Sequence, residues 1–85
     1  MKSLIFERGL LIGGERVVLS LFRAPPGFIL ERRLIERDQS TFVQVLPITV
    51  PYDVQRFAVA DNYSKELAPL YYEVRRQLLE SRTLG

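Results

Sequence analysis

The side chains best suited to catalysis stand in one short segment of this 85-residue chain. Tyr63, Ser64 and Lys65 are adjacent, and Asp61 and Asn62 directly precede them. Such groups can transfer protons or supply a hydroxyl or amine nucleophile. However, adjacent residues do not generally converge on one reacting atom, because active sites gather residues from several elements. We therefore interpret Asp61, Asn62 and Ser64 as turn and helix-capping residues.

The sequence contains neither histidine nor cysteine. Histidine is the commonest general base and metal ligand, and cysteine supplies thiolate nucleophiles, disulfides and zinc or iron–sulfur ligands. The three Asp and seven Glu residues are scattered, so they do not suggest an all-carboxylate metal site. We predict that the protein is not an enzyme and uses no cofactor and no metal.

Arginine dominates the basic residues, with ten Arg and two Lys, and the net charge is +2. Arg32, Arg33 and Arg37 could form a basic patch, and Phe28 or Phe42 could stack on a nucleobase. Most Arg residues have a Glu close by in sequence, and the charge is far below that of strongly basic nucleic-acid domains. Nucleic-acid binding through Arg32, Arg33 and Arg37 is therefore the alternative function.

Two adjacent tyrosines lie in the best helical pattern of the chain, near its C-terminal end. Successive helix positions are about 100° apart. Tyr71 therefore joins the apolar stripe, whereas Tyr72 points round towards Arg75 and Arg76. Tyrosine and arginine are enriched at binding hot spots. We predict a protein-binding surface at Tyr72, Arg75 and Arg76, with a half-buried packing role for Tyr72 as the plain alternative.

Apolar runs in the first fifty residues predict a sheet of about four antiparallel strands. Residues 3–12 and 16–22 are joined by Gly13-Gly14, a strong signal for a two-residue hairpin turn, and Gly9 suggests a bulge. Residues 28–37 have a helical composition, but we predict a strand there because the run 41–48 that follows is rich in β-formers.

The second hairpin is predicted to close at Asp38-Gln39. Pro47 then indicates that the fourth strand lies at an edge of the sheet or is bulged near its end, because proline cannot donate to a strand ladder.

Helices are predicted after the sheet. Pro51 suits the first turn of a short helix over 51–60, which ends at Asp61-Asn62. A longer amphipathic helix is predicted from about Pro69 to Arg82, because proline inside a helix removes a hydrogen bond. The predicted fold class is α+β, with two consecutive hairpins followed by a short helix and a longer C-terminal helix.

The predicted strand register leaves apolar residues on both faces of the sheet. The first turn pairs Leu10 with Val17, and the second pairs Leu34 with Val43. Four Glu-Arg dipeptides place charges on either face without making one face wholly polar. The two helices can cover one face, so the other face needs a partner.

These observations predict a single domain over 1–85 that acts as a small cytoplasmic protein-interaction or accessory-subunit module. The partner is predicted to be a second copy of the chain, giving a homodimer. No apolar run reaches the length of a membrane span, and a Glu-Arg pair interrupts the apolar start, so neither membrane insertion nor a signal peptide is expected.

Overall fold

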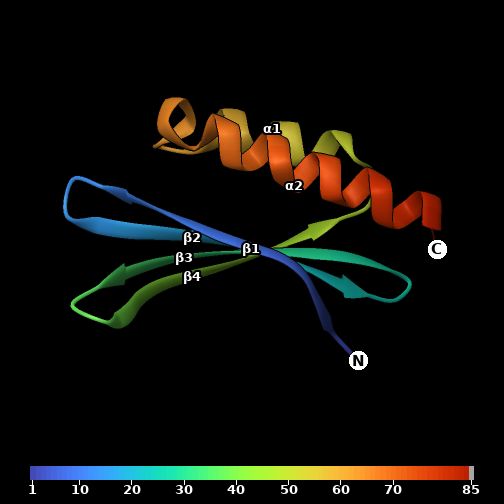
Figure 1. The fold of residues 1–85 in the computed structure, drawn as a ribbon, viewed down its shortest axis with the longest axis horizontal. Coiled ribbons are helices and arrows are strands. Elements are labelled where there is room, and N and C mark those ends of the chain that lie inside the picture. The colour runs from blue at the N-terminus through green and yellow to red at the C-terminus, as the bar shows by residue number, and fades with distance from the viewer. Residues whose placement is uncertain (85) are drawn as a thin grey trace.

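The computed structural model describes residues 1–84 as a four-stranded antiparallel sheet followed by two helices (Figure 1). The sheet has the spatial order β1-β2-β3-β4, so each strand neighbours the next one in the chain. The elements are β1 (Ser3–Ile12), β2 (Glu15–Ala24), β3 (Gly27–Glu36), β4 (Gln39–Ile48), α1 (Tyr52–Ala60) and α2 (Ser64–Leu84). The predicted α+β fold class is confirmed, as is the strand over residues 28–37.

The first hairpin has the predicted turn and register. Gly13 and Gly14 have φ angles of 55° and 89°, the positive values that two-residue hairpin turns require. Leu10 pairs with Val17 as predicted, and Ile12 and Glu15 close the ladder.

The bulge in β1 lies between Leu4 and Phe6, so the prediction of a bulge at Gly9 was wrong. Gly9 pairs regularly with Val18, and a Cβ at Gly9 would lie only 3.1 Å from a methyl group of Val18. Close packing of the strands therefore accounts for this glycine. The bulge also turns Leu4 to the face opposite Phe6.

The second hairpin turns one residue earlier than predicted. Arg37 and Asp38 occupy the turn with φ angles of 53° and 63°, and Gln39 already belongs to β4. Asp tolerates this left-handed conformation because its short polar side chain can bond to nearby backbone.

The bulge that follows this turn changes which face of the sheet the residues of β4 occupy. The earlier turn alone would shift each partner by two residues and keep the faces. Leu34 pairs with Phe42 instead of Val43, and a bulge separates the pairs of Leu34 and Ile35. A shift of one residue exchanges the two faces of a strand. Phe42 therefore shares a face with Leu34, while Val43 and Val45 lie on the other face.

Helix α1 matches the prediction and follows β4 after a short turn. The Asp53 carboxylate accepts backbone hydrogen bonds from Thr49 and Val50, at 2.9 and 3.1 Å, and so ties the start of α1 to the end of β4. Pro51 directly precedes the helix, and Asp61 caps its C-terminal end.

Helix α2 begins at Ser64, so the predicted start near Pro69 was wrong. Pro69 lies inside the helix and leaves the carbonyl of Lys65 without its usual partner. Both residues are exposed, so water can satisfy that carbonyl and the helix continues through the proline.

Both helices pack on the same face of the twisted sheet (Figure 1). The core between the layers contains residues from β2, β3, the end of β4 and both helices: Val17, Leu19, Leu21, Leu30, Ile48, Val54, Leu67, Leu70, Tyr71, Val74 and Leu78. No helix within residues 1–84 is long and apolar enough to cross a membrane.

Candidate functional site

The second face of the sheet is not covered by any element within residues 1–84, as Figure 1 shows. Several of its large apolar side chains are exposed, from 48% at Val43 to 71% at Leu11, with Leu4 and Val45 in between, whereas Val18 on the same face is buried. An apolar face of this kind is typical of an interaction surface.

Four charged groups on this uncovered face are paired with one another, whereas Arg16 on the same face forms no ion pair with any described residue. Lys2 forms an ion pair with Glu31 at 2.6 Å, and Arg33 forms one with Glu7 at 3.0 Å. Glu7 also accepts a 2.6 Å hydrogen bond from the buried hydroxyl of Ser20. Because these four groups have partners within the chain, covering the face would not leave them unpaired.

The two edges of the sheet differ in charge. Strand β1 carries Glu7 and Arg8 and has a bulge, features that discourage pairing with another strand. Strand β4 carries no charged residue from Gln39 to Ile48, and Phe42, Val43 and Val45 expose about half of their surface. The β4 edge is thus uncharged and open to another strand around Gln44, between two features that oppose pairing, the bulge before Phe42 and Pro47.

A buried ion pair joins the helical layer to β3. The Arg32 guanidinium donates from Nε and Nη2 to the Asp61 carboxylate, at 2.6 and 2.9 Å. The Tyr71 hydroxyl donates to the same carboxylate at 2.5 Å, and the backbone N–H of Tyr63 donates at 2.8 Å. Arg32 and Asp61 side chains are only 8% and 1% exposed. The bidentate geometry compensates for the removal of both charges from water.

The surroundings of Asp61 keep it ionised. Burial opposes its charged form, but hydrogen bonds from Arg32 and Tyr71 outweigh this effect and lower the pKa of the Asp61 carboxyl. Burial and the hydrogen bond to Asp61 raise the pKa of Tyr71. The cluster is therefore an ionised Arg–Asp pair with a neutral tyrosine at neutral pH.

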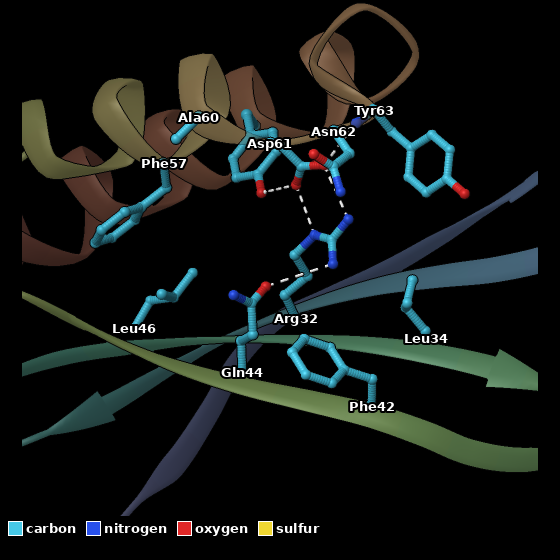
Figure 2. A pocket seen from close by; sticks show the side chains of 11 residues that line it. Arg32, Leu34, Phe42, Gln44, Leu46, Phe57, Ala60, Asp61, Asn62 and Tyr63 are labelled. Carbon is cyan, nitrogen blue, oxygen red and sulfur yellow. Dashed lines mark hydrogen bonds and ion pairs between the residues drawn. The ribbon is translucent and has the colours of Figure 1, made fainter.

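A cavity of about 400 Å³ lies beside this cluster, between β3–β4 and the end of α1 (Figure 2). Leu34, Phe42 and Leu46 line it from the sheet, and Phe57 and Ala60 line it from α1. Arg32 and Gln44 form its polar part, where Nη1 of Arg32 lies 3.4 Å from Oε1 of Gln44.

The structure separates the three arginines predicted to bind nucleic acid. Arg32 points to the helix-covered face, where it pairs with Asp61, and Arg33 points to the opposite face, where it pairs with Glu7. Arg37 lies in the β3–β4 turn. Thus they do not form one continuous patch, and Phe28 and Phe42 lie on the face of Arg32 alone.

The structure places Tyr72 and Arg75 in one groove between α1 and α2, with Val54, Ala58 and Ala68. Tyr72 is 66% exposed, so the half-buried packing role given as the alternative was wrong.

Arg76 does not line this groove, because it pairs with Glu73 at 2.7 Å and Glu80 at 2.9 Å along the same helix. Of the three residues predicted to bind a protein partner, the structure therefore brings two together.

The role of Asp61 was only partly predicted from the sequence. Asp61 does terminate α1, but its carboxylate also binds Arg32, 29 residues earlier. A lone Asp after a helix gives no signal for such a long-range pair. The one usable signal was Arg32 at a strand position facing the helices, since a buried arginine requires an acidic partner.

The fold and its site define a small α+β protein with an uncovered sheet face and a cavity beside a buried ion pair. Comparison with protein-family models, with curated proteins and with solved structures finds no match. Among residues 1–84, no group of acidic side chains is placed to hold a metal ion.

We expect the free energy of unfolding to fall as the pH is lowered below about 4. Asp61 and Asp53 both have a pKa below the ordinary value of 3.8. Each therefore contributes stability that is present above the unfolded pKa and is lost as the pH falls through the folded pKa. Urea unfolding followed by circular dichroism, at fixed protein concentration and decreasing pH, measures this dependence.

The Tyr71→Phe variant is the control for this titration, because it removes one hydrogen bond that lowers the pKa of Asp61. Its loss of stability between neutral and acidic pH should be smaller than in the unmodified chain. Equal stability of the unmodified chain at pH 7 and at about pH 3 would contradict the expectation.

Proposed function

We propose that this chain is a non-catalytic protein-interaction module that forms a homodimer by pairing the β4 strands of two copies. The observation that carries the proposal is the uncharged β4 edge, with Val43 and Val45 exposed beside it on the uncovered face. The proposal keeps the cytoplasmic location expected from the sequence.

Pro47 indicates which backbone groups of β4 face the free edge. A proline in an edge strand occupies a position whose missing N–H would point away from the sheet. Backbone groups alternate in direction along a strand, so Val45 and Val43, two and four residues earlier, also direct their N–H and C=O groups outward. These groups are available for a second strand.

A two-fold axis at Gln44 would use these groups in both copies. It pairs Val43 of one copy with Val45 of the other, and the two residues exchange main-chain hydrogen bonds. On the helix-covered side, Phe42 then faces Leu46 of the other copy. The contact between the two β4 strands is called the seam below, and no charged residue lies along it. Pairing through β1 would instead bring together Glu7, Arg8 and their copies.

A second copy is favoured over a different partner because the β4 edge is complementary to itself. Every residue that would meet across the seam is apolar or an uncharged polar residue. The alternative of nucleic-acid binding has less support, because Arg32 and Arg33 are paired on opposite faces.

The test compares two double substitutions on the same face of the sheet. Val43→Lys with Val45→Lys places lysines directly opposite one another across the proposed seam, where like charges repel. Leu4→Lys with Leu11→Lys adds the same charge on β1, outside the seam. Sedimentation equilibrium at micromolar concentration should find a dimer for the unmodified chain and the β1 variant, and a monomer for the β4 variant.

A monomer in the unmodified chain at every concentration would contradict the proposal. The variant Tyr72→Ala separates the β4 seam from the groove between the helices. Dissociation of the dimer by Tyr72→Ala, with the β4 variant still dimeric, would assign the interface to the helices. Circular dichroism must show that each variant keeps its secondary structure.

A further inference from the structure

The walls of the cavity beside the Arg32–Asp61 pair are polar and apolar in nearly equal parts. The rings of Phe42 and Phe57 and the side chain of Leu46 approach it from both layers of the fold (Figure 2). Its volume of about 400 Å³ falls in the range of sites for small organic ligands. The apolar part of the walls therefore suits a flat apolar or aromatic group.

The polar part of the cavity can offer donors but has little capacity to accept. The two oxygens of Asp61 already accept four hydrogen bonds, from Nε and Nη2 of Arg32, the Tyr71 hydroxyl and the Tyr63 backbone. A carboxylate has about four acceptor positions, so Asp61 is saturated.

Arg32 and Gln44 retain unused donors. The hydrogen bonds of Arg32 to Asp61 and Gln44 use three of its five N–H groups. Gln44 accepts through Oε1, and its amide NH₂ donates no hydrogen bond within the described residues. The one contact between the two, at 3.4 Å, is long and can be replaced at little cost.

We propose that this cavity binds a small molecule with a flat apolar or aromatic body that ends in a carbonyl or carboxylate oxygen. The body lies between Phe42 and Phe57, and the oxygen accepts from Nη1 of Arg32 and the Gln44 amide. A ligand that ends in a cation is disfavoured, because Asp61 has no free acceptor position and the Arg32 guanidinium repels a second cation. Phe42, Gln44 and Leu46 line the cavity and also lie along the proposed contact between two β4 strands, whereas Val43 and Val45 point to the other face. The cavity is formed within one chain, so ligand binding can be measured in the Val43→Lys with Val45→Lys variant, separately from the dimer.

The test is a titration of the ¹⁵N-labelled protein, followed by NMR, with benzoate, benzamide and benzylamine at millimolar concentration. Benzoate and benzamide should both give saturable shifts at Phe42, Ala60, Asn62 and the Gln44 side-chain amide. Comparison of these two probes separates a carboxylate ligand from a neutral carbonyl ligand. Benzylamine, which ends in a cationic donor, should bind at least about tenfold more weakly.

The variant Gln44→Glu tests the polar contact without a large change of size. The new carboxylate pairs with Arg32 and replaces the donor with an acceptor, so benzoate binding should weaken by about tenfold or more. The matched control is Gln55→Glu, the same charge change at an exposed position of α1 outside the cavity, which should leave binding unchanged. If Gln44→Glu does not fold, Ala60→Leu, which fills the cavity from α1, should abolish the shifts instead.

Three results would overturn the proposal. The first is the absence of saturable shifts at the cavity residues with both acceptor probes. The second is binding of benzylamine as tight as that of benzoate. The third is an equal effect of Gln44→Glu and Gln55→Glu on benzoate binding, which would mean that general charge alone controls the interaction.

Discussion

Replacing Asp61 with alanine is expected to lower the free energy of unfolding by about 3–5 kcal/mol. The substitution leaves the Arg32 guanidinium buried without a counter-ion, and an unpaired buried charge is strongly unfavourable. It also removes the acceptor for the Tyr71 hydroxyl. Since small domains have total stabilities of about 5–15 kcal/mol, much of the population could unfold at ambient temperature. Urea unfolding followed by circular dichroism measures the loss.

Two further variants distinguish the ion pair from its surroundings. Tyr71→Phe removes one hydroxyl and should cost about 1 kcal/mol. The double variant Arg32→Met with Asp61→Ala removes both charges, and it should be more stable than Asp61→Ala alone. A double variant as unstable as the sum of its single variants would show that the two residues act independently.

Leu78→Ala is expected to destabilise the protein by about 2–5 kcal/mol. Leu78 is fully buried between α2 and the sheet, so the substitution removes apolar contacts and leaves a cavity in a core formed by only two layers. Thermal or urea unfolding of the purified variant measures the change.

The neighbouring residue on the same helix provides a matched control. Leu79 is 39% exposed, and Leu79→Ala makes the same chemical change with the same effect on helix propensity. Its expected cost is about 1 kcal/mol or less. Similar losses for the two variants would mean that α2 does not pack on the sheet through the face that contains Leu78.

The element order could be predicted because local signals agreed with the global fold. Gly13-Gly14 specified the first turn and its register, and Pro47 specified an edge strand. The turn of the second hairpin could not be predicted, because Arg37 and Asp38 compete with Asp38-Gln39 as turn residues on almost equal terms. The register beyond the turn depends on the bulge between Leu34 and Ile35, and no glycine or proline in this segment marks that bulge.

The candidate site was harder to predict than the fold. Arg32 and Asp61 are distant in sequence, and each has an ordinary local role, in a strand and at the end of a helix. Their pairing depends on the angle at which the helices cross the sheet, which no local pattern encodes. The same reason explains why the cavity beside Gln44 has no sequence signal, since its residues come from four separate segments.

The difference between the two sheet edges also limits the size of the proposed assembly. Contact through the same edge of both copies is isologous, so it closes with two-fold symmetry and leaves no unused β4 edge. The outer edges of the combined sheet are then both β1, with the charges of Glu7 and Arg8 and the bulge before Phe6. Growth into a fibril would have to start at these edges, where the residues oppose it. In the proposed assembly, association is therefore expected to end at two chains.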